Sequence, residues 1–502
     1  MPPTATLSPS RTYLTAVFLL ALGCLGPIWL PRFPALQDYP QHLFLAHVNA
    51  TFNDPRYNWR HFYQADLRLG PYVVFYAVVV WLERFVPVVV AGKLFLSGYI
   101  ACLAWVAILM RGQVDTPDRP PWGCLLLFPL AFSQMYFLGF TNYLLSLPLL
   151  LVAWLDHQRL CQGEAPPWLW GRQVLIVGLI FLCHPYTILV YLCLAAGNLL
   201  LPNPDGGRRR PAALAPPGAT LLLFALWYIL KLPGNHGRMP LLWWPLAENL
   251  RYYLLMFTAM RWTNGLDWPS VLTWLAALLL VVWGLIRRVK AGGKMPGRLS
   301  LALGLATAGF FILPFWAGQY SYFNLRLAPV SYLLAALLAG FGLLPPLAGV
   351  GLALLCGLLI GLSAAVQAGV SRETAQIVPL LAEMAPNAKL LPMTFHTESA
   401  LLDPHFFPEI HSHDYFYYHL LVGGGASPSL FPSPMLPVSF KPGVDLPLAT
   451  HQFSWLEQGS HYDYILTRGA PSAFAPFVSR YAVPVGKSGE WQLFKNPKPP
   501  AR

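Results

Sequence analysis

An acidic residue, Asp38, stands four positions before His42 in the segment Leu36-Gln-Asp-Tyr-Pro-Gln-His, directly after the first long apolar run of the chain. A charge held at the edge of a membrane costs free energy and usually marks a functional site. If the chain becomes helical after Pro40, this spacing places the carboxylate and the imidazole on one face. Asp38 is therefore a candidate catalytic base and His42 a candidate substrate contact. The alternative is that Asp38 only caps a helix at the membrane surface.

Three further polar residues interrupt apolar sequence. Asn142 ends the corner Gly139-Phe-Thr-Asn, His184 precedes a proline between two apolar runs, and Arg326 stands at the start of another run. A guanidinium group is well suited to hold a phosphate through two parallel hydrogen bonds. We predict that all three contact a substrate or its phosphate. Each also has a structural alternative, which is helix capping for Asn142, hydrogen-bonded scaffolding for His184 and snorkelling to the interface for Arg326.

The composition determines the class of protein. Of 502 residues, 56% are hydrophobic and only 11% are charged. A soluble protein could not cover so much apolar surface, so the chain is predicted to be a polytopic α-helical membrane protein. Its formal charge of +12 suits loops that face anionic lipid headgroups, so no nucleic-acid partner is invoked. None of the seven cysteines lies beyond Cys356, which excludes a disulfide within the polar tail.

Apolar runs of roughly bilayer length recur along the chain and predict about eleven membrane spans. Residues 13–30 lack a small-residue cleavage site and are interpreted as a retained first span. Clustered Arg and Lys residues fall in alternate loops, which places these loops and the N-terminus in the cytoplasm and the C-terminal region outside. The predicted spans are 13–30, 88–110, 122–137, 138–157, 172–183, 186–200, 217–232, 267–286, 298–316, 328–342 and 345–366.

Two segments of the outer loops are predicted to lie in the membrane interface. Residues 71–84 are apolar but too short to span with confidence, and they are interpreted as a half-inserted helix. Residues 239–262 mix arginines with Trp243, Trp244 and Tyr252, which is typical of an aromatic belt.

Residues 370–502 are predicted to form a small mixed α/β domain outside the membrane, separate from a membrane module formed by residues 1–369 with its external loop 31–87. Strands are expected at 389–395 and 462–467 and a helix at 411–422. His411 and His413 are candidate contacts of the acceptor substrate or plain surface histidines. The density of histidines and acids also leaves open a metal site, although the spacing fits no tight ligand set. The residues concerned are His396, His405, His411, His413, His419, Asp403, Glu409 and Asp414.

The order of these parts resembles the GT-C superfamily of integral-membrane glycosyltransferases, which use polyprenyl-phosphate-linked sugars. The chain is particularly similar to the bacterial branch related to the protein O-mannosyltransferases and the lipid A aminoarabinose transferase. In that family an acidic residue begins the first external loop, as Asp38 does here, and an interfacial helix follows, as at Pro71. The family's acidic residue at the second external corner is replaced by Asn142. Its later basic residues correspond to His184 and Arg326.

This resemblance implies an inverting transferase that acts on the outer face of the membrane. Asp38 would accept the proton of an acceptor hydroxyl, and Arg326 with His184 would stabilise the departing phosphate. The partners would be a polyprenyl-phosphate-linked sugar, membrane lipids and a lipid, glycan or protein acceptor. Sugars pack on aromatic faces, so the acceptor side would include Trp243, Trp244 and Tyr252. A divalent metal (Mg²⁺, Mn²⁺ or Zn²⁺) is the cofactor to consider. Asn142 argues against it because an amide is a weaker ligand than a carboxylate. A bacterial inner membrane, with a periplasmic tail, suits the short loops.

Other functions remain open from the sequence. A secondary transporter would need paired repeats and mid-span charges, and the chain shows no repeat of fixed period. An envelope binding protein without catalysis would not need so many spans as an anchor. A glycan polymerase or ligase of another fold generally concentrates function in a late loop, whereas Asp38 lies in the first.

Overall fold

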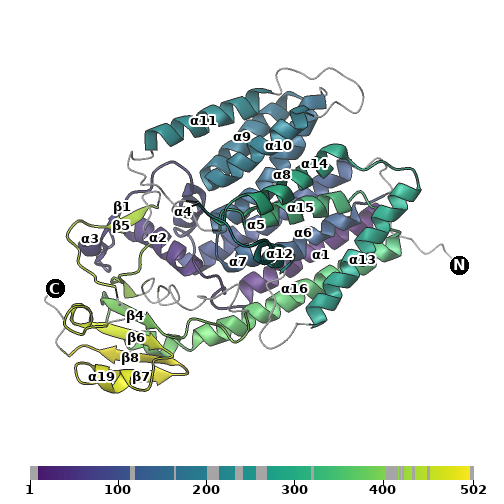
Figure 1. The fold of residues 1–502 in the computed structure, drawn as a ribbon. Helices are drawn as coiled ribbons and strands as arrows, with labels where there is room; N and C mark the ends of the chain where they lie inside the picture. The colour runs from purple at the N-terminus through teal and green to yellow at the C-terminus, as the bar shows by residue number, and fades with distance from the viewer. Residues whose placement is uncertain are drawn as a thin grey trace.

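The computed structural model describes most of residues 9–497, and its bundle of helices ends in a small sheet (Figure 1). A helix occupies each segment in which a span was predicted. These helices are α1 (Pro9–Trp29), α5 (Val88–Met110), α8 (Thr141–Gln162), α9 (Pro167–Cys183), α10 (Pro185–Leu200), α11 (Ala215–Lys231), α13 (Trp268–Lys290), α14 (Gly297–Ile312), α15 (Leu327–Ala339) and α16 (Pro346–Ala375), with three shorter helices between 122 and 137. The ranges that lie outside the described residues are 1–8, 114–118, 163–165, 201–213, 232–240, 256–267, 318–321, 403–416, 418–419, 421–422, 432–435, 449–452 and 498–502.

Four helices are long and apolar enough to cross a membrane. They cover Ser10–Trp29, Val88–Gln113, Trp268–Lys290 and Pro346–Ala375. The other apolar helices are shorter, so the prediction of eleven crossings remains a prediction. Inside a lipid bilayer every backbone N–H and C=O group needs a hydrogen-bond partner within the protein. An α-helix provides these partners within its own segment.

The segment 122–137 differs from the single span that was expected. It forms the 3₁₀-helix η2 (Trp122–Leu126) and two short helices, α6 (Leu127–Leu130) and α7 (Gln134–Phe137). Pro129 has no N–H to donate, and Ser133 is extended with ψ of 172°, so the helix cannot continue. The chain therefore reaches the following corner as a series of short turns packed inside the bundle.

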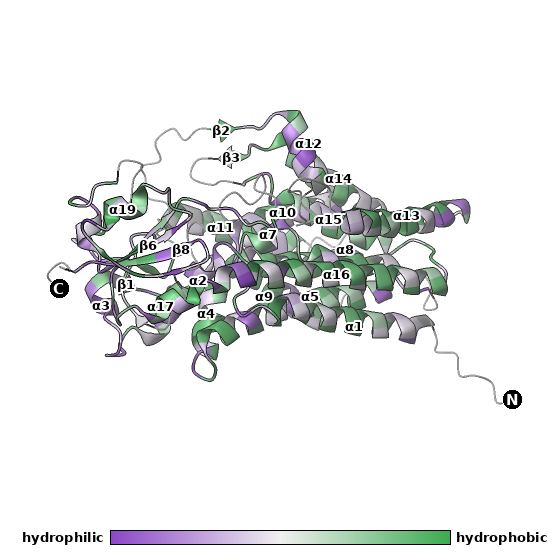
Figure 2. Cartoon of the chain, turned by 90° about the horizontal axis from the view of Figure 1, so that it is seen from below, coloured by the Kyte–Doolittle hydropathy of each residue, from purple (hydrophilic) through white to green (hydrophobic). Residues whose placement is uncertain are grey.

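The helices run in a common direction, and the sheet lies at one end of them (Figure 2). α1 packs along α16 and α5, and α8 packs along α9 and α10. The basic last turn of α13, with Arg287, Arg288 and Lys290, lies at the end far from the sheet (Figure 2). This basic turn and the sheet of the tail are therefore at opposite ends of the bundle, which is consistent with the predicted orientation.

Short elements of the first outer loop lie near the sheet end. They are α2 (Tyr39–Thr51), α3 (Trp59–Phe62), β1 (Tyr63–Ala65) and α4 (Val73–Leu82), and α4 falls within the predicted interfacial helix. In the second interfacial segment, α12 (Leu246–Leu255) is helical. β2 (Leu241–Leu242) pairs with β3 (Trp316–Ala317) beside it.

The tail forms a four-stranded mixed sheet in the order β4-β6-β8-β7. The predicted strands 389–395 and 462–467 appear as β4 (Leu390–Thr394) and β6 (Tyr464–Arg468), which pair in parallel. β7 (Val483–Ser488) and β8 (Trp491–Lys495) complete the sheet, α17 (Val378–Ala382) precedes it, and α19 (Phe474–Val478) packs nearby. Most of the predicted helix 411–422 lies outside the described residues.

A further strand of the tail leaves this sheet and joins the first outer loop. β5 (Val438–Phe440) pairs antiparallel with β1, and Tyr63 is opposite Phe440. α16 continues without a break past residue 370 to Ala375. The β1–β5 pairing and the continuous helix α16 both connect the two sides of the predicted boundary at 369/370. The division into a membrane module and a tail domain there therefore stays a prediction.

Candidate active site

The loop before α2 is held between the corner at residues 138–143 and α16. The backbone N–H of Asp38 donates to the carbonyl of Leu138 at 3.2 Å. Gly139 has a φ of +81°, and a Cβ there would come within 2.9 Å of the Asp38 nitrogen, so only glycine permits this approach. On the other side, the side chain of Gln367, buried in α16, accepts from Ala35 N–H at 2.8 Å.

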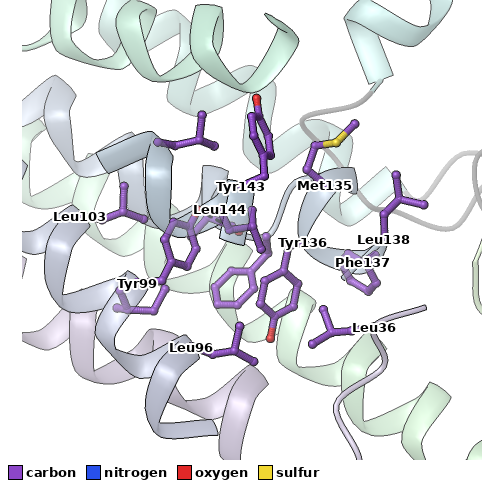
Figure 3. Close-up of a cluster of buried hydrophobic side chains, with 14 of the residues drawn as sticks. Leu36, Leu96, Tyr99, Leu103, Met135, Tyr136, Phe137, Leu138, Tyr143 and Leu144 are labelled. Atoms are coloured by element: carbon purple, nitrogen blue, oxygen red, sulfur yellow. Dashed lines mark hydrogen bonds between the residues drawn. The ribbon is translucent and has the colours of Figure 1, made fainter. Parts of the chain in front are cut away.

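The apolar packing beneath the corner keeps it rigid. Leu36, Tyr136, Phe137 and Leu138 are almost fully buried and lie together in Figure 3, with Leu96 of α5 below them. A corner packed on all sides has few alternative positions. The backbone that carries Asp38 is therefore positioned by the core rather than by solvent-exposed loop contacts.

Asp38 and His42 are related as their spacing predicted. α2 starts at Tyr39, with Pro40 in its first turn, and the N–H of His42 donates to the Asp38 carbonyl at 3.1 Å. Asp38 occupies the N-cap position, but its side chain makes no capping hydrogen bond. The carboxylate of Asp38 therefore does not cap α2, which was the structural alternative to a catalytic role.

Tyr76 of α4 completes the group around Asp38 and His42. Its hydroxyl lies 2.6 Å from Nδ1 of His42. Burial and then the nearby charge of Asp38 raise the pKa of Tyr76, which places the carboxylate close to this hydroxyl. Burial lowers the pKa of His42 from 6.5 to about 4, so the imidazole is neutral at physiological pH. A neutral imidazole can accept or donate a hydrogen bond beside the carboxylate without sharing its charge.

The tail lies next to His42 and is held there by hydrogen bonds to the buried side chain of Gln41. Gln41 donates to the Tyr417 hydroxyl at 3.0 Å and to the Ser429 carbonyl at 2.9 Å, and it accepts from Phe431 N–H at 3.1 Å. These bonds hold the ring of Phe431 with its centroid 5.2 Å from that of His42. The tail is therefore a direct neighbour of the candidate catalytic helix.

The lowered pKa of His42 predicts a pH-dependent stability. The folded protein keeps this imidazole neutral down to about pH 4, whereas the unfolded chain binds the proton near pH 6.5. The stability that depends on the neutral ring is therefore complete above pH 6.5 and is lost as the pH falls toward 4. Between these limits the wild type should lose about 2 kcal/mol more than His42→Gln. Denaturant unfolding of both proteins in detergent, with the exposed His61→Gln as control, measures this. Parallel curves for wild type and His42→Gln would contradict the prediction.

Asn142 bridges two helices by bonding to backbone. Its Oδ1 accepts from Phe75 N–H at 2.9 Å, and its Nδ2 donates to the Tyr72 carbonyl at 2.8 Å. It therefore caps α4, a different helix from its own, next to Tyr72 in a left-handed conformation with φ of 68°. The predicted substrate contact is untested, and the amide already has a structural task that an aspartate could not perform in full.

Replacing this amide should destabilise the fold. In Asn142→Ala the Phe75 N–H and the Tyr72 carbonyl lose their partner in a buried setting, which should lower the free energy of unfolding by about 1–3 kcal/mol. Asn142→Asp should also destabilise because it cannot donate to the carbonyl. Thermal melting in detergent measures both, with the exposed Asn53→Ala as control. Melting of Asn142→Ala at the wild-type temperature would show that the bridge contributes nothing.

His184 breaks the apolar stretch as predicted. It is extended (φ −158°, ψ 119°) between the end of α9 and Pro185 at the start of α10, and only 4% of it is exposed. Its ring lies 4.9 Å from that of Tyr72 and 5.2 Å from that of Tyr143, centroid to centroid. Burial, followed by the charge of Arg326, lowers the pKa of His184, so this ring is also neutral.

Arg326 lies at the same corner from another direction. Its guanidinium carbon is 5.4 Å from the centroid of the Phe140 ring and 6.0 Å from that of Tyr186. The hydroxyl of Tyr143 donates to the Arg326 carbonyl, which fixes the start of α15. Within the described residues, Nε of Arg326 is buried without a hydrogen-bond partner and no carboxylate pairs with the side chain. Such a guanidinium retains the donors that a phosphate would need.

Two of the predicted acceptor contacts, Trp244 and Tyr252, are linked to Arg326 by a row of aromatic rings, each of which contacts the next. Trp244 stacks on Phe315 with centroids 3.8 Å apart, and it also packs on Tyr252 at 4.4 Å. Phe315 contacts Tyr322 at 5.5 Å, and Tyr322 contacts Phe140 at 6.2 Å beneath the guanidinium. Trp243 instead donates to the Ile312 carbonyl at 2.9 Å and is exposed. His411 and His413 lie outside the described residues.

The structure thus brings four of the predicted residues to one corner, Leu138–Tyr143, namely Asp38, Asn142, His184 and Arg326, while His42 lies one turn along α2 from Asp38 and contacts Tyr76. It also adds residues that the sequence did not indicate. We did not predict a role for Tyr76, Tyr143 or Gln41, because tyrosines in apolar runs and glutamines in loops are common and do not by themselves indicate a site. Gln367 could have been predicted from the sequence, because a glutamine inside a long apolar helix needs a polar partner.

A metal centre has no support in the described part of the chain, where no group of three His, Cys, Asp or Glu residues is placed to bind an ion. Of the tail residues considered for a metal, only His396 is described, and its Nδ1 pairs with Glu490 at 2.8 Å. The other seven lie outside the described residues, so a metal site formed by them remains a prediction from the sequence.

Comparisons with known proteins gave one likeness. No family model and no curated protein matches the chain. Among solved structures, the chain is similar to the crystal structure of ArnT from Cupriavidus metallidurans bound to undecaprenyl phosphate. The identity is 11% and the TM-score 0.49, over 97% of this chain and 99% of that chain. A likeness at this level does not establish a family or an activity, which must come from the chain's own residues.

Proposed function

We propose that this protein is an inverting glycosyltransferase that moves a sugar from a polyprenyl-phosphate donor to an acceptor of the cell envelope. The observation that carries the proposal is the meeting of Asp38 and Arg326 at one corner. Asp38 is hydrogen-bonded through its backbone to Leu138, and Arg326 lies over Phe140 two residues later. Asp38 and Arg326 both contact this corner, next to helices of membrane-spanning length, and a carboxylate base with a cation that can bind phosphate fits a lipid-phosphate donor and a hydroxyl nucleophile.

The chemistry needs one base and one group that stabilises the leaving phosphate. The acceptor oxygen attacks the anomeric carbon while the bond from that carbon to the phosphate oxygen breaks. Asp38 accepts the proton of the acceptor hydroxyl, and the electron pair of the broken bond remains on the polyprenyl phosphate. Arg326 stabilises the charge that develops there, which is the larger part of such catalysis. The phosphate needs no proton to leave, so no second acid is required, and attack from the opposite face inverts the anomeric configuration.

Neutral histidines support these two groups. His42 and Tyr76 form a hydrogen-bonded pair beside the Asp38 carboxylate, and they can orient the acceptor hydroxyl without adding a competing charge. His184 lies against Tyr143, whose hydroxyl fixes the Arg326 backbone. His184 thereby acts as a positioning residue on the phosphate side.

The same proposal places the protein in a bacterial inner membrane. The basic ends of the helices would face the cytoplasm, and the site, α2 and the tail sheet would face the periplasm. The separation of the basic last turn of α13 from the sheet supports this orientation (Figure 2). Donor and acceptor would then meet at the outer leaflet.

The deciding experiment measures turnover of radiolabelled undecaprenyl-phosphate sugars by the purified protein in liposomes, with cell-envelope extract outside as acceptor. A transferase releases undecaprenyl phosphate and moves label onto the extract. A transporter would instead carry label across the bilayer without cleaving the donor, and a binding protein would retain it uncleaved. Absence of cleavage with a panel of hexosyl and pentosyl donors would overturn the transferase proposal.

A further inference from the structure

A cavity of about 350 Å³ lies against the start of α4, between the first outer loop and the tail. This volume is at the lower end of the range for small-molecule sites in proteins. Its walls come from three distant parts of the chain. They include Gln64, Arg68, Tyr76, Trp227, Leu436 and Ser439.

Hydrogen bonds between the first outer loop and the tail build the cavity's frame. β1 and β5 pair with Gln64 opposite Ser439, and the N–H of Asp66 donates to the Pro437 carbonyl at 2.8 Å. Because both walls are fixed by backbone pairing, the cavity is largely preformed rather than a gap between loose loops.

Tyr76 connects this cavity to the catalytic group. Tyr76 is one of the residues that line the cavity, and its hydroxyl is hydrogen-bonded to His42, which lies one helical turn after Asp38. A hydroxyl-bearing ligand in the cavity would therefore lie one side chain away from the turn of α2 that carries the proposed base. Arg326 and its row of aromatic rings are not part of this wall.

The lining has the chemistry of a carbohydrate site. Trp227, which is partly exposed, offers an aromatic face for the apolar side of a sugar ring. Gln64 and Ser439 offer neutral hydrogen-bond donors and acceptors, and Arg68 is paired with Asp66 in an exposed ion pair. The two charges cancel, which disfavours an isolated phosphate. The lining also includes apolar side chains such as Leu67, Val73 and Leu436, and this mixture suits a sugar ring, which has both polar and apolar faces.

We propose that this cavity binds the saccharide of the acceptor and presents its hydroxyl to Asp38. This inference rests on the proposed transferase function and assigns the two substrates to different places, with the acceptor at the cavity and the donor phosphate at Arg326. It also replaces Trp243, Trp244 and Tyr252 as the acceptor wall, because the row of rings connects Trp244 and Tyr252 to Arg326.

The test introduces a thiol into the cavity wall by Ser439→Cys. Ser439 is exposed, and the chain has no natural cysteine beyond Cys356, so a charged, membrane-impermeant maleimide should reach the introduced thiol selectively. Cell-envelope glycan extract is the probe. At ten times its dissociation constant it should slow alkylation about tenfold, since only the unoccupied cavity reacts. Alkylation should in turn lower transfer to the extract about 100-fold compared with the same protein before treatment, while labelled donor remains bound.

Two controls distinguish binding in this cavity from nonspecific effects of the extract or of the maleimide. Ser479→Cys places a thiol on the exposed end of α19, and its alkylation should be unaffected by the extract and should leave transfer unchanged. Extract oxidised with periodate, which destroys sugar diols, should no longer protect the thiol at position 439.

The outcomes distinguish failure of the cavity from failure of the proposed function. Complete alkylation at position 439 without loss of transfer, or no protection by the extract, overturns the cavity assignment even if the wild type is an active transferase. If the wild type cleaves no donor, the transferase proposal falls. Protection that is lost on periodate treatment would then still support a saccharide site in this cavity.

Discussion

Asp38→Asn should lower the rate of sugar transfer by about 10²- to 10⁴-fold, the usual contribution of a positioned general base. Asparagine has nearly the same shape but cannot accept the acceptor's proton. The backbone bonds from Asp38 to Leu138 and from His42 to Asp38 do not involve the side chain, so the loop should keep its position. The loss should therefore fall on kcat, with the KM for the donor little changed.

Initial rates of undecaprenyl phosphate release measure this effect. Asp54→Asn is a matched control, because Asp54 lies in the same outer loop and pairs with the exposed Arg56 at the surface. It should behave as the wild type. If Asp38→Asn turned over the donor as fast as the wild type, Asp38 would have no part in the mechanism.

Arg326→Ala should lower kcat/KM by about 10²- to 10³-fold, as expected for loss of one group that stabilises transition-state charge. Arg326→Lys should recover only part of this loss, because an ammonium keeps the charge but not the planar fork that fits a phosphate. The guanidinium lies over Phe140 and Tyr186, and the backbone at this position is fixed by Tyr143. The shorter side chain of alanine should therefore leave the corner in place.

Arg84→Ala gives the control for loss of a positive charge on the outer loops, since Arg84 is exposed just after α4. Its kinetics should match the wild type. Binding of undecaprenyl phosphate alone is a second measurement, and Arg326→Ala should weaken it. Full binding and full turnover in Arg326→Ala would assign Arg326 to interfacial anchoring instead.

Local patterns in the sequence predicted much of this protein. Long apolar runs predicted helices at 13–30, 88–110, 267–286 and 345–366, and these helices are present because a bilayer-length apolar run has few other structures available. Pro40 and Pro185 predicted helix starts, and a helix starts at or beside each of them. Alternation and turn residues predicted the positions of β4 and β6.

Other features needed the tertiary structure. The sequence predicted one span over 122–137 where the chain makes three short helices, because the backbone is extended at Ser133, with ψ of 172°. Asn142 looked like a cap for its own helix or a ligand, and it caps α4 instead, 67 positions away from Phe75. No periodicity encodes such a pairing.

The sequence by itself determined the class of protein, the helical segments and the residue types that could carry the reaction, since hydropathy and proline act over a few neighbouring residues. Only the tertiary structure decided which of these residues meet. Tyr76 joins Asp38 and His42, Gln41 binds Phe431 of the tail, and the cavity forms where β1 pairs with β5. These contacts depend on packing between residues that are 34 to 390 positions apart, for which no local pattern in the chain provides a signal.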